Sequence, residues 1–180
     1  NRVENYLNYK LNNKIKNSAA HTRRLLFHLP AYGCGYKKLF LDVDSGQPRV
    51  IHIPGDSLIY DYWAESIEDA PHITHLYYLN YNEIEENIRK GVFVDHDLGE
   101  GEAKKPETTT SKEVIESPSS DRSWFYGEQH RWLDLDHDGF EEPWICTFHI
   151  PTKKISRIRA AFRAEDVTMN ETGEISKIKR

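Results

Sequence analysis

The stretch that decides the fold is residues 124–150, which read WFYGEQHRWLDLDHDGFEEPWICTFHI. Two runs rich in aromatic and aliphatic residues, 124–133 and 144–150, flank the acidic segment 134–142. Such runs favour strands, and the polar segment between them favours a turn. A third run, 155–162, follows after a short polar turn. The pattern therefore predicts an antiparallel meander.

Further strands are predicted upstream and downstream of this meander. Runs 38–43 and 49–53 flank residues 44–47, where a glycine allows the positive φ of a hairpin turn. Two more runs, at 57–63 and 72–78, read as a third and a fourth strand. A last turn at 170–174 separates two short runs: 167–169 and 175–178.

Helices are predicted at the start of the chain. Two amphipathic helices are expected within residues 1–29, because apolar residues recur at steps of four and then resume beyond an Asn-Ser break. These apolar residues are Val3, Leu7, Leu11, Ile15, Leu25, Leu26 and Leu29. We expect Pro30, Gly33 and Gly35 to end the second helix.

A single helix is predicted at 81–90. Asn80 stands three residues before Glu83, the spacing of a capping box in which each side chain bonds the other residue's backbone N–H. Gly91 follows two basic residues and suits a left-handed helix terminator. Together with the strands, these helices predict an α+β fold with helices segregated from an antiparallel sheet.

The predicted domain has three parts, since an acidic stretch interrupts it. Residues 1–94 hold the helices and first hairpins, and residues 123–180 hold the meander of the same domain. Between them, 95–122 contains eight acids, four bases and only four apolar residues. Such a segment buries too little to order itself, so we expect a flexible acidic insertion.

Composition excludes several classes of protein. The 180 residues carry 24 Lys plus Arg against 29 Asp plus Glu, for a net charge of −5, which argues against a generally basic nucleic-acid-coating protein. The longest apolar runs are far too short to cross a bilayer, so no membrane association is expected. Two cysteines are too few for a disulfide framework. The ends of the sequence lead us to expect a piece of a longer polypeptide.

The most specific local motif is the acidic segment between the first two meander strands. Carboxylates alternate at its positions one, three and five, and an acid stands at position nine, as in loops that bind Ca²⁺. The candidate ligands are Asp134, Asp136, Asp138, the backbone carbonyl of Phe140, and Glu142. Ile145 occupies position twelve, where an EF-hand needs Glu. The alternative is an acidic turn whose Asp side chains cap their own backbone.

No catalytic motif stands out. Residues 33–38 lack the ending of a phosphate loop, and the histidines lack zinc-like spacing. Neither Cys34 nor any acid lies in a triad or elbow pattern, so we expect no enzyme. A basic cluster could contact phosphates if its side chains interleave with those of Trp144 and Phe148. Trp144 is also predicted to be a core aromatic. This cluster comprises Lys153, Lys154, Arg157, Arg159 and Arg163.

The order of motifs along the chain resembles one known family. A helical start is followed by LPAYGCGYKK at 29–38 and RVIHIPGDSLIYD at 49–61, then a Gly-terminated helix and WLDLDHDGFEEPWI at 132–145. This order resembles the portal protein, or head-to-tail connector, of tailed bacteriophages. The resemblance covers nearly the whole chain apart from the acidic insertion.

This resemblance implies a structural role in the virion and, during assembly, in the host cytoplasm. Portal proteins form a ring, usually of twelve subunits, at one capsid vertex. They contact the terminase, the capsid and the tail or adaptor proteins, and DNA passes through their channel. This segment matches the peripheral wing region, so direct DNA contact is not expected of it. A calcium-dependent, β-rich binding module is the alternative function.

Overall fold

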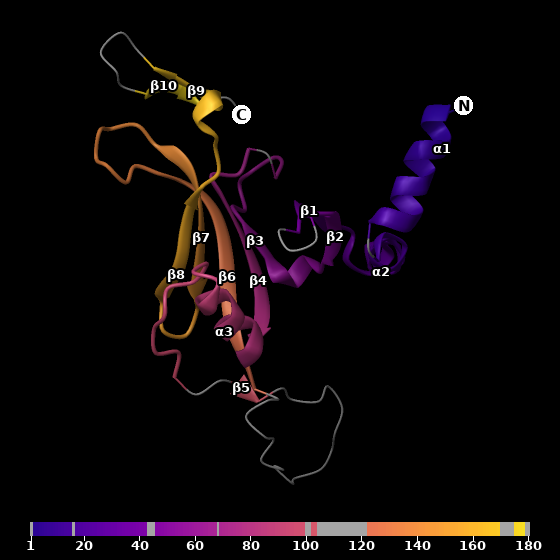
Figure 1. Ribbon diagram of the computed structural model, residues 1–180, viewed down its shortest axis with the longest axis horizontal. Helices are drawn as coiled ribbons and strands as arrows, with labels where there is room; N and C mark the ends of the chain where they lie inside the picture. The colour runs from indigo at the N-terminus through magenta and orange to yellow at the C-terminus, as the bar shows by residue number, and fades with distance from the viewer. Residues whose placement is uncertain are drawn as a thin grey trace. The chain divides into compact units, whose positions relative to one another are not determined.

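The computed structural model describes residues 2–15, 17–42, 46–67, 69–99, 102–103, 122–169 and 175–178. The chain divides into two compact units, Asn1–Leu58 and Ile59–Arg180, and each is described by itself (Figure 1). Helices and antiparallel strands are both present, which confirms the predicted α+β class. The division at Leu58 differs from the predicted first segment of 1–94. Strand β4 and helix α3 lie within 59–94, and they join the meander of 123–180, which the prediction assigned to the same domain.

The first unit contains two helices and one hairpin. Its elements are α1 (Arg2–Tyr9), a π-helical turn (Lys10–Lys14), α2 (Ser18–Tyr32), β1 (Tyr36–Leu41), β2 (Pro48–Ile53) and a 3₁₀ turn (Gly55–Ser57). Helix α2 passes through Pro30, so this proline does not end it as predicted. Proline removes only one hydrogen bond, and the helix continues to Gly33, whose φ of 73° and bond to the carbonyl of Leu29 end it.

The hairpin predicted around residues 44–47 is confirmed. Strands β1 and β2 pair antiparallel from Tyr36 opposite Ile53 to Leu41 opposite Pro48, and Gly46 adopts a φ of 62°. Helix α2 contacts β2, where the backbone N–H of His52 donates to Nδ1 of His21 at 3.2 Å. Of the residues in α1 and α2 whose side chains are described, none is buried within this chain, so their apolar stripes remain largely exposed.

The second unit is built on a six-stranded sheet. Its elements are β3 (Leu58–Tyr60), β4 (His72–Asn80), α3 (Tyr81–Arg89), β5 (Glu102–Ala103), β6 (Arg122–Leu133), β7 (Glu142–His149), β8 (Lys154–Ala160), a 3₁₀ turn (Ala164–Asp166), β9 (Val167–Met169) and β10 (Ile175–Ile178). The strand order is β3-β4-β6-β7-β8, with β5 paired to β6, while β9 and β10 form a separate hairpin. The predicted meander is confirmed as the antiparallel strands β6, β7 and β8.

The third predicted strand is shorter than expected. Strand β3 ends at Tyr60, because the Asp61 carboxylate accepts the backbone N–H of Trp63 at 2.9 Å and turns the chain. Tyr62 and Trp63, predicted as strand residues, are exposed on this turn.

Helix α3 is the predicted capped helix. The backbone N–H of Asn80 donates to Oε2 of Glu83 at 2.8 Å, both bonds of the capping box are present, and Gly91 has a φ of 70°. The helix buries Ile84 against Trp124 and Tyr126, which form the core of the sheet unit. Local capping and one apolar stripe are therefore enough to explain this helix.

Strand register assigns side chains to two faces of the sheet. Tyr77 lies opposite Tyr126 on the face beneath α3, which we name the covered face. Tyr78 lies opposite Phe125 on the other side, the opposite face. Trp144, predicted as a core aromatic, lies on this opposite face and is only half-buried, because its neighbour there is Phe162 at the margin of the sheet.

The segment after α3 stays with the sheet for longer than predicted. The backbone N–H of Val94 donates to the carbonyl of Ser156 at 2.8 Å, and Leu98 packs against the core. Residues 95–99 thus run beside β8, although the predicted insertion begins at 95. Residues 104–121, the greater part of that predicted insertion, lie outside the described residues.

Candidate functional site

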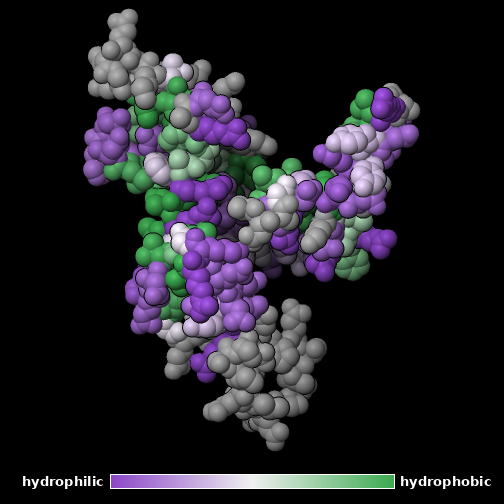
Figure 2. Space-filling model, in the orientation of Figure 1, coloured by the Kyte–Doolittle hydropathy of each residue, from purple (hydrophilic) through white to green (hydrophobic). Residues whose placement is uncertain are grey.

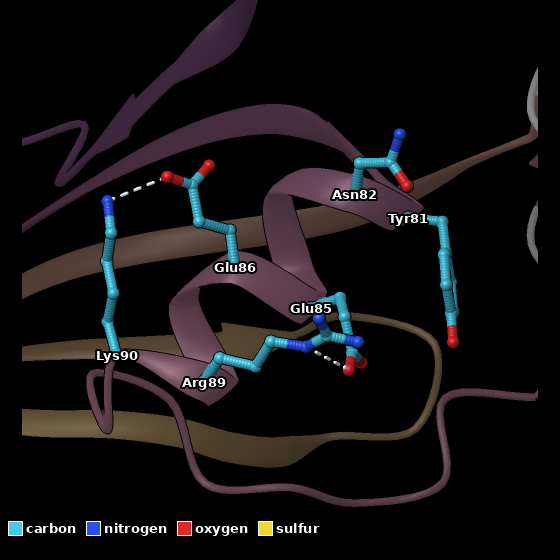
Figure 3. A pocket seen from close by; sticks show the side chains of 6 residues that line it. All are labelled: Tyr81, Asn82, Glu85, Glu86, Arg89 and Lys90. Atoms are coloured by element: carbon cyan, nitrogen blue, oxygen red, sulfur yellow. Dashed lines mark hydrogen bonds and ion pairs between the residues drawn. The ribbon is translucent and has the colours of Figure 1, made fainter.

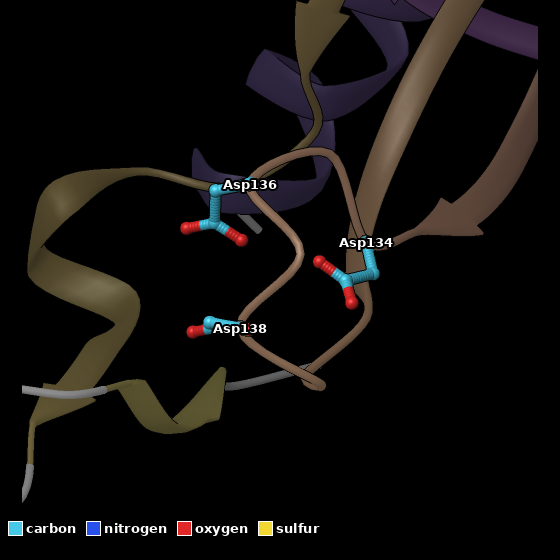
Figure 4. Close-up of side chains that lie close together, drawn as sticks. All are labelled: Asp134, Asp136 and Asp138. Carbon is cyan, nitrogen blue, oxygen red and sulfur yellow. The ribbon is translucent and has the colours of Figure 1, made fainter.

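The aspartate loop connects β6 to β7 and holds three of the five predicted metal ligands close together. Each of Asp134, Asp136 and Asp138 offers a carboxylate oxygen, and these oxygens lie within 4.8 Å of one another (Figure 4). The alternation at every second position brings them to the same side of a tight turn. Hard oxygen ligands in this arrangement suit Ca²⁺, which takes six to eight oxygens and would need water to complete its shell.

The same carboxylates also close the loop on itself. Asp134 accepts the backbone N–H of His137 at 2.7 Å and that of Gly139 at 3.0 Å, and Asp138 accepts the N–H of Phe140 at 2.7 Å. Desolvation opposes ionisation of Asp134, but the bonds from Gly139 and His137 prevail and lower its pKa. These capping bonds are the ones that the alternative interpretation, an acidic turn, calls for.

Glu142 is not part of this cluster. It is the first residue of β7, is 5% exposed, and its Oε2 accepts the indole N–H of Trp144 at 3.2 Å. The prediction treated Glu142 as the ninth residue of a loop. In the structure Glu142 pairs with Leu133 of β6 and therefore already belongs to strand β7. Phe140 is half-buried at the end of the loop.

The basic cluster divides differently from the prediction. Arg157 lies opposite Thr147 and Arg159 opposite Ile145, so both arginines share one face as expected. Trp144 and Phe148 lie on the other face, because strand residues alternate, and the predicted interleaving of aromatics with cations is wrong. Burial, and then the charge of Arg159, lower the pKa of Arg157.

Burial favours the neutral form of three ionisable groups in the sheet unit. Burial raises the pKa of the Tyr77 hydroxyl and of the Cys146 thiol, and burial followed by the charge of His96 lowers the pKa of His149. His149 shares a hydrogen bond of 2.8 Å with the hydroxyl of Thr152. A thiol of raised pKa is a poor nucleophile, so Cys146 packs as a small apolar residue.

A shallow pocket of about 470 Å³ lies on the solvent side of α3. Its lining residues are Tyr81, Asn82, Glu85, Glu86, Arg89 and Lys90. Figure 3 shows that their charges pair along the helix, Arg89 with Glu85 at 2.9 Å and Lys90 with Glu86 at 2.8 Å. Such pairs one helical turn apart stabilise the helix by a few tenths of a kcal/mol, and they pair both cations of the pocket with its acids.

Sequence reasoning missed the acidic side of the sheet. Residues 50–88 contain eight acids and neither Lys nor Arg, and part of this stretch forms β3 and the turn after it. The run of acids is visible in the sequence. The pattern of strand-forming residues, however, does not show that this run lies at an edge of the sheet.

Comparison with protein family models and with curated proteins finds no match for this chain. Within the described residues, no helix is both long enough and apolar enough to span a bilayer.

Proposed function

We propose that this chain is a structural assembly module of a phage portal ring, in the wing region, and that it performs no chemistry on a substrate. Its partners would then be further copies of itself, the terminase, the capsid, and tail or adaptor proteins. It would be found in the virion and, during assembly, in the host cytoplasm. DNA would pass through the channel of the complete ring without contacting this segment directly.

The observation that carries this proposal is the large apolar side chains that the folded sheet unit leaves in solvent. Tyr62 and Trp63 are 87% and 86% exposed, and Ile155 is 57% exposed. Exposed apolar groups of this size and grouping mark surfaces that a partner covers. The pKa shifts of Tyr77, Cys146 and His149, by contrast, all favour the neutral form.

The motifs of the resemblance also occupy places that suit a scaffold. Segment 29–38 joins α2 to β1, segment 49–61 runs from β2 through a tight turn into β3, and segment 132–145 is the β6–β7 connection. Each is a turn with parts of the two elements that it connects, and none of them lines the pocket on α3.

Electron microscopy and native mass spectrometry of the complete polypeptide that contains this chain test the proposal. We expect closed rings of one subunit type. Particles that remain monomeric over the whole accessible concentration range would contradict the portal assignment.

We propose calcium binding by the aspartate loop as a second function, favoured by the carboxylates that lie within 4.8 Å of one another. Calorimetric titration of the chain with Ca²⁺ should show saturable binding that Asp136→Ala abolishes. Asp69→Ala, which removes one carboxylate elsewhere, is the matched control and should bind as the parent does. A flat titration of the unmodified chain would reject this function and leave the loop as a structural turn.

A further inference from the structure

The two edges of the six-stranded sheet are chemically different. The order β3-β4-β6-β7-β8 places β3 at one edge and β8 at the other (Figure 1). Edge strands present backbone groups and side chains that another chain can bind. The side chains and backbone groups exposed at each edge therefore indicate which chemistry that edge can bind.

The edges carry opposite charge. Residues 59–69 contain four acids and no Lys or Arg, and those of them that the structure describes, 59–67 and 69, start in β3 and continue into the following turn. Residues 150–163, which contain β8, hold five Lys or Arg and no acid. The acids are Asp61, Glu65, Glu68 and Asp69, and the cations are Lys153, Lys154, Arg157, Arg159 and Arg163. A single sheet thus has one acidic and one basic edge.

Each edge also exposes apolar side chains, and on β8 these lie on the face opposite to that of Arg157 and Arg159. On the acidic edge these are Tyr62 and Trp63, both more than four-fifths exposed. On the basic edge they are Ile155 and Ile158, 57% and 44% exposed, and Figure 2 shows hydrophobic side chains reaching the surface along the β8 side of the sheet. Aromatic anchors within a charged rim are the usual composition of a protein interface.

Residues 94–97 lie along the beginning of β8, near Lys154 and Ser156, and the later part of the strand is the part considered for docking. The carbonyl of Ser156 accepts a bond from Val94 outside the sheet, whereas the N–H of Ala161 donates inward to Pro143 of β7. Because strand residues alternate, the N–H and C=O groups of Ile158 and Ala160 point away from β7. A neighbouring chain can therefore add hydrogen bonds to the side-chain contacts there.

We infer that the segment 59–69 of one copy of this chain docks on β8 of the next copy. Two identical edges would bring like charges together, but the acidic edge of one copy and the basic edge of another are complementary. A contact between different surfaces of identical chains is head-to-tail, and it closes into a ring when the rotation between copies permits. The inference deepens the proposed ring function and rests on it.

Charge reversal tests this pairing in the chain itself. Lys153→Glu/Arg159→Glu lowers the formal charge of residues 150–163 from +5 to +1, and Glu65→Lys/Asp69→Lys raises that of residues 59–69 from −4 to 0. All four side chains are exposed. By sedimentation velocity at low salt, the unmodified chain should self-associate and dissociate as salt is added. Each double variant should associate at least about tenfold more weakly, since one of the two edges then has almost no net charge to attract the other. An equimolar mixture of the two variants should regain association, because their edges are complementary again.

The matched control is Arg89→Glu/Lys90→Glu on α3, which changes the charge by the same amount away from both edges and should leave association unchanged. Trp63→Ala should weaken association without altering the charge. Circular dichroism confirms that each variant is folded. A chain that stays monomeric at all concentrations, reversals without effect, or a mixture that fails to regain association would each overturn the inference. Rings formed by the complete polypeptide, insensitive to the same reversals, would overturn this pairing while leaving the proposed function in place.

Discussion

The covered and opposite faces of the sheet are made from alternating residues of the same strands, yet they differ in burial. On the covered face, Tyr126 is fully buried and Trp124 is 8% exposed beneath α3. On the opposite face, Tyr78 remains 53% exposed although it stacks on Phe125 with ring centroids 4.7 Å apart. Both faces carry aromatic rings, so the burial of a ring depends on which face helix α3 covers.

This difference separates two roles for aromatic residues. Rings on the covered face stabilise the fold, because α3 removes them from water. Rings on the opposite face and at the sheet edges contribute less to the isolated chain and more to association. Substitutions of sequence neighbours that point to different faces should therefore have very different effects on stability.

The largest expected effect comes from Trp124→Ala. Loss of a buried indole beside Ile84 should lower the free energy of unfolding by roughly 3–5 kcal/mol. Phe125→Ala, one residue away on the opposite face, should cost about 1–2 kcal/mol, since its ring is only half-buried. Denaturant titration of both variants measures the difference. Equal losses would contradict the assignment of the two faces.

Gly127→Ala should have the next largest effect. A methyl group at Gly127 would lie 2.8 Å from the ring of Phe148 on the opposite face. Such overpacking costs roughly 1–3 kcal/mol, less where the neighbouring ring can tilt. Phe148→Leu provides a smaller side chain and should restore part of the lost melting temperature in the double variant. A single variant as stable as the parent would show that the opposite face repacks freely.

Asn80→Ala should cost about 1 kcal/mol by removing the helix cap. The Asn80 side chain bonds the backbone of the first turn of α3, and its loss leaves an unpaired N–H at the helix that forms the covered face. Asn80→Asp keeps the acceptor and serves as the control. Thermal unfolding followed by circular dichroism should show a lower midpoint for alanine alone.

The smallest expected effect is a pH dependence from His149, which is 1% exposed on the covered face. Its pKa in the folded protein lies below the unfolded value of 6.5, so the folded state binds fewer protons. Stability should be constant above pH 6.5 and decline below it, by at most about 1.4 kcal/mol per pH unit. His149→Gln should flatten this part of the profile, and an identical slope in that variant would exclude His149 as the cause.

Local patterns were enough to predict the elements. The capping box at Asn80 and Glu83 predicted α3, and alternating aromatic runs predicted the meander of β6, β7 and β8. In both cases the determining interactions lie within a few residues of one another. The same holds for the aspartate loop, where three carboxylates at alternate positions meet across one turn.

Predictions failed where distant residues decided the outcome. Glu142 left the predicted ligand set because β7 begins there, opposite Leu133 of β6. Trp144 and Phe148 were separated from Arg157 because pairing with β8 fixes which face each residue occupies. A shift of one residue in register would exchange the two faces, and sequence alone does not set that register across a turn.

By itself, the sequence determined the α+β composition, the capped helix, the hairpins and the acidic turn, because propensity, capping and turn chemistry act between near neighbours. Only the tertiary structure decided which face of the sheet α3 covers and which charged segments form its two edges. Those outcomes depend on pairing between strands far apart in the chain, such as β4 with β6, and such pairing is fixed only when the whole sheet assembles.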